Sequence, residues 1–198
     1  MVFTAGIVGS VLVYVWLVEG RAPDDLVYIP GAIVVILTAW HNALRREWGF
    51  SWQGFWKGLT MTLAASVALC AVILAGGAGV GTLHDRRDFL GNFAPLILWG
   101  GAQQWVLQTV VLREAQRSSS RKTGIFIAAL LFGAVHLPNP FLAPVTAAAA
   151  LLWCWLYDRY CNIIPLALSH ALGTMAVLYA FDTEITGRLR IGAAFLRL

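Results

Sequence analysis

Charged residues are scarce in this chain, and their scarcity excludes a water-soluble fold. Only 12% of the 198 residues are Asp, Glu, Lys or Arg, whereas 59% are hydrophobic and the mean hydropathy is +0.73. A soluble domain carries about 25% charged residues. The composition therefore predicts an integral membrane protein. With about 20 residues per crossing there is room for roughly six to eight helices, so we expect one membrane domain over residues 1–198.

Cysteines and ligand-binding motifs are also few. Cys70, Cys154 and Cys161 include no CxxC spacing, which argues against a disulfide framework or a zinc cluster. The glycine cluster GGAGVG at residues 76–81 lacks the Lys-Ser/Thr of a phosphate-binding loop, and we interpret it as the close-packing end of a helix. No basic patch is interleaved with aromatic residues, so the net charge of +4 points to membrane lipids rather than nucleic acid. We expect no cofactor and no metal ion.

Seven apolar runs, bounded by charge or by Pro and Gly, are the main feature that is present. They cover about residues 2–19, 26–43, 59–83, 90–112, 123–137, 141–157 and 163–181. These lengths are typical of transmembrane helices. The predicted fold is thus all-α, a polytopic membrane helical bundle of about seven transmembrane helices.

The connection at residues 45–58 predicts one further helix. Trp48, Trp52 and Trp56 recur there at helical spacing, beside basic residues, which is typical of an amphipathic helix in the headgroup plane. A loop carrying an aromatic belt is the alternative. If seven helices alternate, eight Lys or Arg lie on the side of the N-terminus and six lie opposite, which favours a cytoplasmic N-terminus.

Acidic residues are missing from the centres of the apolar runs, where other polar groups stand instead. The carboxylates all lie in or beside connections, whereas the apolar runs carry Gln103, Gln104, Gln108, His136, Ser169, His170 and Thr174, with His41 and Asn42 near the end of the second run. Each of these groups would cost roughly 1–3 kcal/mol if left unsatisfied in lipid. We therefore expect them to turn inward and meet.

The spacing of these groups suggests how they could meet. Gln103 and His136 are 33 residues apart, and His136 and His170 are 34 apart, so each interval holds about one helix and its return. Pro138 and Pro140 follow His136 and lack amide donors, which we expect to leave nearby carbonyls available to water or a ligand. Two interpretations stay open. The polar groups are interhelical glue, or they form a buried hydrolytic site whose histidines polarise water or hold an oxyanion.

At these residues the chain resembles the CPBP family, the intramembrane peptidases related to CaaX prenyl proteases and bacteriocin-processing enzymes. The family motifs are EExxxR, FxxxH and HxxxN. FGAVH, residues 132–136, matches the second motif, and SHALGT places His170 at the third with Thr174 in place of Asn. QQWVLQ, residues 103–108, falls on the first. The resemblance covers about residues 95–178.

The resemblance implies roles for these positions. In the family a glutamate of the first motif, with the FxxxH histidine, activates the attacking water, and the last His and Asn stabilise the oxyanion. Here Gln103 and Gln104 stand at the glutamates and Gln108 at the arginine. A carboxamide cannot accept a proton at neutral pH, so a histidine would have to be the base. Glu114, ten residues past Gln104 and about 15 Å along a helix, is no replacement.

The resemblance implies an intramembrane endopeptidase that acts on hydrophobic or lipid-modified peptides, with His136, His170, Gln103, Gln104 and Thr174 at its site. It also implies a multi-pass protein of a bacterial or archaeal inner membrane. Because the glutamates are replaced, a catalytically inactive relative that binds membrane peptides or acts as a scaffold is the alternative. A small transporter is a further alternative.

Overall fold

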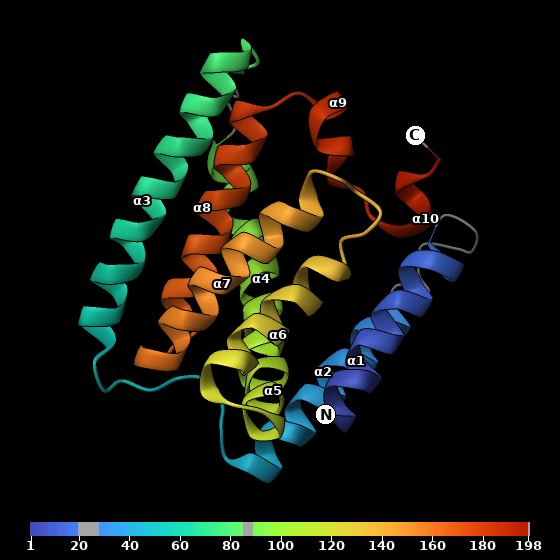
Figure 1. The fold of residues 1–198 in the computed structure, drawn as a ribbon, viewed down its shortest axis with the longest axis vertical. Coiled ribbons are helices and arrows are strands. Elements are labelled where there is room, and N and C mark those ends of the chain that lie inside the picture. Colours follow the sequence, from blue (N-terminus) through green and yellow to red (C-terminus); the bar gives the residue numbers. More distant parts are fainter. Residues whose placement is uncertain (20–27, 85–88, 198) are drawn as a thin grey trace. The chain divides into compact units, whose positions relative to one another are not determined.

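The computed structural model describes residues 1–19, 28–84 and 89–197, which form helices joined by short connections (Figure 1). The elements in chain order are α1 (Val2–Val13), η1 (Tyr14–Val18), α2 (Tyr28–Arg45), α3 (Phe55–Val80), α4 (Phe89–Val106), η3 (Leu107–Leu112), α5 (Arg113–Ser118), α6 (Arg121–Ala134), α7 (Leu142–Tyr160), α8 (Ile164–Ala180), α9 (Thr183–Thr186), η4 (Gly187–Leu189) and α10 (Gly192–Phe195). The described residues form no strand, although one isolated antiparallel bridge joins Phe50 to Asn162. The all-α class is confirmed.

A helix covers most of the described residues of each of the seven apolar runs, although the third run's helix ends at Val80 and the fifth run's helix at Ala134, three residues before the predicted ends. The first and the fourth end as π-helical turns, η1 and η3. By length and composition, one helix of the described chain, Phe55–Val80, is able to cross a bilayer, and Val2–Val18 and Ile164–Ala180 are apolar but shorter. The prediction of seven spans is therefore not confirmed.

The predicted interfacial helix at residues 45–58 is wrong. The helix α2 ends at Arg45, the next helix starts at Phe55, and the residues between them are turns and extended chain. The backbone takes a positive φ at Gly49 (82°) and Gly54 (73°), and neither value belongs to a right-handed helix. Trp52 is 69% exposed, so the alternative of an aromatic loop describes this segment better.

The residue contacts divide the chain into two compact units. The first comprises Met1–Trp48, Val106–Trp155 and Thr186–Leu198. Within it α1 packs along α2, and the ring of Phe3 stands edge-on to His41 with 5.3 Å between centroids. The start of α10 lies on η1 so closely that a Cβ at Gly192 would come 2.4 Å from the Val15 carbonyl oxygen. Only glycine fits there.

The second unit comprises Gly49–Trp105 and Leu156–Ile185, and its main contact is α3 along α8. A Cβ at Gly77 would lie 2.3 Å from the carbonyl oxygen of Ala180, so the glycine cluster is the close-packing helix end that its composition predicted. Nearer to the N-terminal ends of α3 and α8, Ser66 Oγ donates to Ser169 Oγ at 2.8 Å. The expectation of a single membrane domain stays a prediction.

Candidate functional site

The FxxxH motif is a local structure at the end of α6. The Nδ1 atom of His136 donates to the carbonyl oxygen of Phe132 at 2.6 Å, one helical turn back. The two rings lie 5.0 Å apart, and Phe132 also stands edge-on to Trp153 on α7, at 6.3 Å. The spacing of four residues is thus needed to hold the imidazole ring. Because Nδ1 carries the proton, the neutral ring has its lone pair on Nε2.

The turn after His136 is held by Asn139, whose side chain is fully buried. Its Nδ2 donates to the carbonyl oxygens of Thr186 and Arg190, both at 2.9 Å. Its Oδ1 accepts from the amides of Phe141 at 3.0 Å and Leu142 at 2.9 Å, and so caps the start of α7. These four bonds use the full capacity of a carboxamide.

The carbonyls of this turn are not left for a ligand as the prolines suggested. The Leu137 carbonyl accepts from the amide of Gly192 at 2.9 Å, and the His136 carbonyl accepts from the amide of Asn139 at 3.2 Å. At these two carbonyls the expectation was wrong, because Gly192 of the C-terminal segment and Asn139 of the turn itself supply donors. Asn139 was not among the predicted site residues, although its place between two prolines is a signal for a helix cap.

The second histidine of the resemblance lies against a glutamine of the first motif. Gln104, on α4, is fully buried, and its Nε2 donates to Nδ1 of His170, on α8, at 3.3 Å. A Cβ at Gly100 would come 3.0 Å from the Cβ of His170, so this glycine allows the two helices to approach. In the neutral ring of His170 the proton is then on Nε2, which is a hydrogen-bond donor.

The other motif residues that the sequence singled out lie on α4, α8 and η3. Gln103 precedes Gln104 on α4, and its Oε1 is buried with no hydrogen bond in the part of the chain that the structure describes. Thr174 follows His170 by one turn of α8 and is half-buried. Gln108 is fully buried in the π-helical turn η3. Such turns are frequent at functional sites, and no sequence pattern signalled this one.

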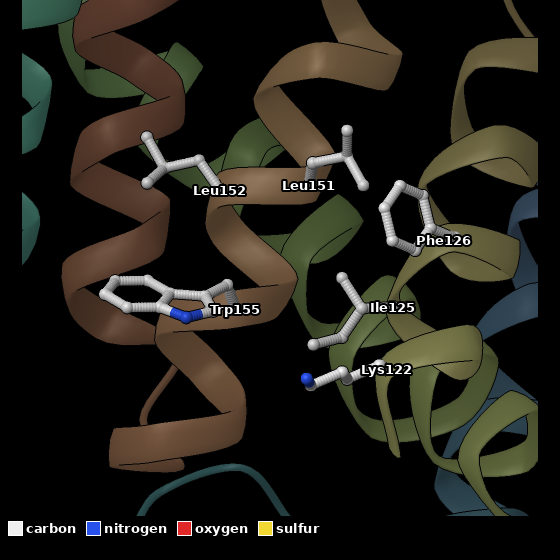
Figure 2. A pocket seen from close by; sticks show the side chains of 6 residues that line it. All are labelled: Lys122, Ile125, Phe126, Leu151, Leu152 and Trp155. Carbon is white, nitrogen blue, oxygen red and sulfur yellow. The ribbon is translucent and has the colours of Figure 1, made fainter. Parts of the chain in front are cut away.

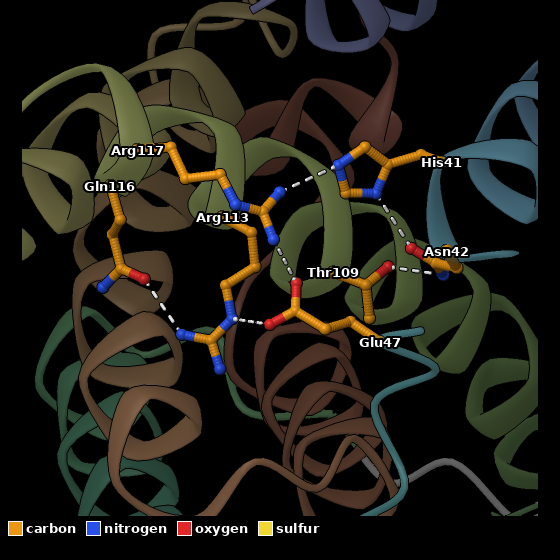
Figure 3. Close-up of polar contacts among 7 residues, drawn as sticks. All are labelled: His41, Asn42, Glu47, Thr109, Arg113, Gln116 and Arg117. Atoms are coloured by element: carbon orange, nitrogen blue, oxygen red, sulfur yellow. Dashed lines mark hydrogen bonds and ion pairs between the residues drawn. The ribbon is translucent and has the colours of Figure 1, made fainter. Parts of the chain in front are cut away.

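His41 and Asn42 belong to a polar network in the first unit that the sequence did not predict (Figure 3). His41 Nδ1 donates to Asn42 Oδ1 at 3.1 Å, and Asn42 Nδ2 donates to Thr109 Oγ1 at 2.9 Å. Arg117 donates to His41 Nε2 at 3.3 Å and pairs with Glu47 at 2.6 Å. This network joins the end of α2 to η3 and α5, as interhelical glue does.

Glu114 is engaged elsewhere, as expected of a residue that does not replace the missing glutamates. Its Oε2 accepts from the amide of Thr4, in the first turn of α1, at 2.8 Å. Burial raises the pKa of Glu114, but the hydrogen bonding at Thr4 and Phe3 and the charge of the N-terminal ammonium together outweigh burial and hold the pKa below its ordinary value of 4.5.

The structure brings two of the five predicted site residues into contact. Gln104 and His170 are bonded within the second unit, which also contains Gln103 and Thr174, whereas His136 lies in the first. A common pocket for the two histidines therefore stays a prediction. In the described chain, no three His, Cys, Asp or Glu side chains gather as metal ligands would.

A comparison with protein-family models supports the resemblance to the CaaX-type proteases. Residues 86–176 match the family model Rce1-like, described as type II CAAX prenyl endopeptidase Rce1-like. This segment contains the three motifs, so the resemblance seen in the sequence is confirmed. The chain matches no curated protein and no solved structure.

Proposed function

From the Rce1-like match over residues 86–176, we propose that this protein is an intramembrane endopeptidase of the CaaX-protease type that uses histidine instead of glutamate as its base. Its substrates are hydrophobic or lipid-modified peptides. His136 is the general base, His170 is the oxyanion donor, and Gln103, Gln104 and Thr174 line the site. The complementary protonation of the two histidines is the observation that carries the proposal.

The two rings are oriented for opposite tasks. The bond from His136 Nδ1 to the Phe132 carbonyl leaves a lone pair on Nε2, which is what a general base needs. The bond from Gln104 to His170 Nδ1 leaves the proton on Nε2, which is what an oxyanion donor needs. Both imidazole rings are neutral in these protonation states, so neither ring is a buried charge that needs a counter-ion.

The proposed reaction consumes one water molecule. His136 Nε2 takes a proton from the water as its oxygen attacks the scissile carbonyl carbon, and the carbonyl becomes a tetrahedral oxyanion that accepts a hydrogen bond from His170. The carbon–nitrogen bond then breaks, and the imidazolium of His136 returns the proton to the leaving amine. The immediate products are a carboxylic acid and an amine, which become a carboxylate and an ammonium at neutral pH, and the base is neutral again.

The glutamines have a positioning role in this scheme. The Oε1 atom of Gln103 is buried and accepts no hydrogen bond from the described residues, so it is suited to receive one from the attacking water. Gln104 holds the ring of His170. Neither amide can take the proton itself.

The same amides favour a second candidate, an inactive relative that binds membrane peptides without cleaving them. A site that keeps hydrogen-bonding groups but loses its carboxylates retains recognition and loses turnover. Both candidates place the chain in a membrane. We propose that its seven apolar helices cross the bilayer together, in a bacterial or archaeal inner membrane.

A cleavage assay on the reconstituted chain separates the two candidates. The substrate is a fluorogenic farnesylated peptide with a CaaX tail, and the variants are His170→Ala, Gln103→Glu and Gln104→Glu. His84→Ala is the matched control, since His84 pairs with Asp182 at 2.6 Å and has no place in the scheme. We expect turnover by the wild type, a loss of about 100- to 1000-fold in His170→Ala, and no loss in the control.

A silent wild type that still binds the peptide would overturn the proposal in favour of the binding relative. Rescue of such a silent chain by Gln103→Glu or Gln104→Glu would show that the site lacks only its carboxylate.

A further inference from the structure

The helices α6 and α7 touch at one end of their pairing and separate toward the other. At the closed end, a Cβ on Gly133 would lie 2.7 Å from the Cβ of Ala147 and 2.8 Å from the carbonyl oxygen of Ala143. Between the start of α6 and the C-terminal half of α7 lies a groove of about 410 Å³, shown in Figure 2, lined by Lys122, Ile125, Phe126, Leu151, Leu152 and Trp155.

The chemistry of this groove is apolar with one cation. Five of its six lining residues are aliphatic or aromatic, and Phe126 is 58% exposed and Trp155 38% exposed. Lys122 stands on the first turn of α6, and in Figure 2 its side chain lies at the same end of the groove as Trp155. Lys122 makes no ion pair or hydrogen bond with any residue that the structure describes.

We propose that this groove binds an anionic phospholipid, with an acyl chain along its apolar wall and the acidic headgroup at Lys122. An acyl chain matches a long surface without hydrogen-bonding groups, because it has no polar atom to satisfy there. A lysine beside a tryptophan marks the level of the lipid headgroups. An unpaired ammonium at that level attracts an anionic headgroup more than a zwitterionic one.

Charge complementarity selects this occupant over others. The isoprenoid chain of a lipid-modified peptide is uncharged, so the chain itself makes no ion pair with Lys122. A transmembrane helix of a partner would be placed against an exposed ammonium, which has no counter-ion on the groove wall. The lipid site depends on the membrane location of the protein and not on peptidase activity.

The test measures quenching of Trp155 in nanodiscs by phospholipids with brominated acyl chains. Brominated phosphatidylglycerol and brominated phosphatidylcholine are compared at equal mole fraction. The fluorescence of Trp155→Phe is subtracted, because the chain has nine tryptophans. We expect the wild type to favour the anionic lipid by about five-fold, which corresponds to one lysine near the bilayer surface.

The decisive variant is Lys122→Gln, and its matched control is Lys57→Gln, which removes the other lysine of the chain, on the first turn of α3. We expect Lys122→Gln to abolish the preference and Lys57→Gln to keep it. Equal quenching by both lipids in the wild type would overturn the proposal, and so would a preference that survives Lys122→Gln or falls equally in Lys57→Gln. Those outcomes would reduce the groove to ordinary lipid contact or to general surface charge.

Discussion

Two regions of the first unit hold a histidine in the same protonation state and use it differently. His41 and His136 both donate from Nδ1 to an oxygen, the Asn42 side chain in one case and the Phe132 carbonyl in the other. At His41 the second ring nitrogen accepts from Arg117. At His136 the second nitrogen has no hydrogen bond within the described residues.

The difference separates a structural histidine from one available for chemistry. A ring with both nitrogens bonded cannot exchange a proton without breaking a contact, and His41 is 1% exposed within a network that ties α2 to α5. A ring with one nitrogen bonded is oriented and still able to take a proton. The bonding of Nε2 is thus the feature that distinguishes the two histidines.

The largest expected effect tests this difference directly. His136→Ala should lower cleavage of the farnesylated peptide by about 100- to 10,000-fold, because the general base is removed, with little change in the melting temperature. His41→Ala should do the reverse, since it removes one hydrogen-bond partner from Arg117 and one from the Asn42 side-chain oxygen. Turnover per folded molecule and thermal unfolding in detergent are measured side by side. An equal loss of activity in the two variants would show that His136 and His41 do not differ in their role in cleavage.

A second change asks what holds His136 in place. Asn139→Asp keeps the oxygen that caps α7 but loses the donors to Thr186 and Arg190. Two carbonyls lose their donors, and an unsatisfied buried group costs about 1–3 kcal/mol. We therefore expect a loss of about 3 kcal/mol in unfolding free energy. Asn162→Asp is the control, because it loses one donor, to Ser51. If both variants unfold alike, the C-terminal segment does not hold the turn.

A third change extends the comparison to His170. A Cβ at Gly100 would press on the Cβ of His170 at 3.0 Å, whereas one at Gly101 would meet only the Cβ of Ala167 at an ordinary 3.5 Å. Gly100→Ala should thus displace the ring from Gln104 and lower kcat about ten-fold. Gly101→Ala should leave kcat near that of the wild type. Identical kinetics in the two variants would remove His170 from the mechanism.

The smallest expected effect concerns acid stability at the contact between Glu114 and Thr4. The pKa of Glu114 is below its ordinary value of 4.5 in the folded chain, so its stabilising contribution is complete above that value and is lost as the pH falls through the folded pKa. Glu114→Gln should therefore reduce the fall in melting temperature between pH 6 and pH 3. The exposed Glu184→Gln is the charge-matched control. A wild-type acid response in Glu114→Gln would show that the bond to Thr4 adds no stability.

Much of the helical arrangement was predictable from local composition. A long apolar run bounded by charge or by Pro and Gly has few alternatives to a helix, and a helix covers most of the described residues of each of the seven predicted runs. The aromatic segment at residues 45–58 was mispredicted because tryptophan spacing ignores the backbone. Gly49 and Gly54 adopt a positive φ there, and the periodicity of side chains carries no sign of it.

The candidate site was predictable as residue types and not as contacts. Motif order singled out Gln104 and His170, yet their bond joins residues 66 apart in the chain, and Asn42 and Thr109 are joined over 67. The sequence grouped His41 and Asn42 with the site histidines, whereas the structure bonds them to Thr109 and Arg117. The residues that neighbour each polar side chain in the sequence do not indicate which distant residue it bonds.

The amino-acid sequence by itself determined that this protein is built of apolar helices, that its few buried polar groups need partners, and that the first motif carries amides instead of acids. Those properties follow from the chemistry of each side chain and its neighbours in the chain. Tertiary structure alone decided that His170 keeps its proton on Nε2 and that Nε2 of His41 is bonded, because both depend on a distant amide or guanidinium that helix packing brings within 3.3 Å.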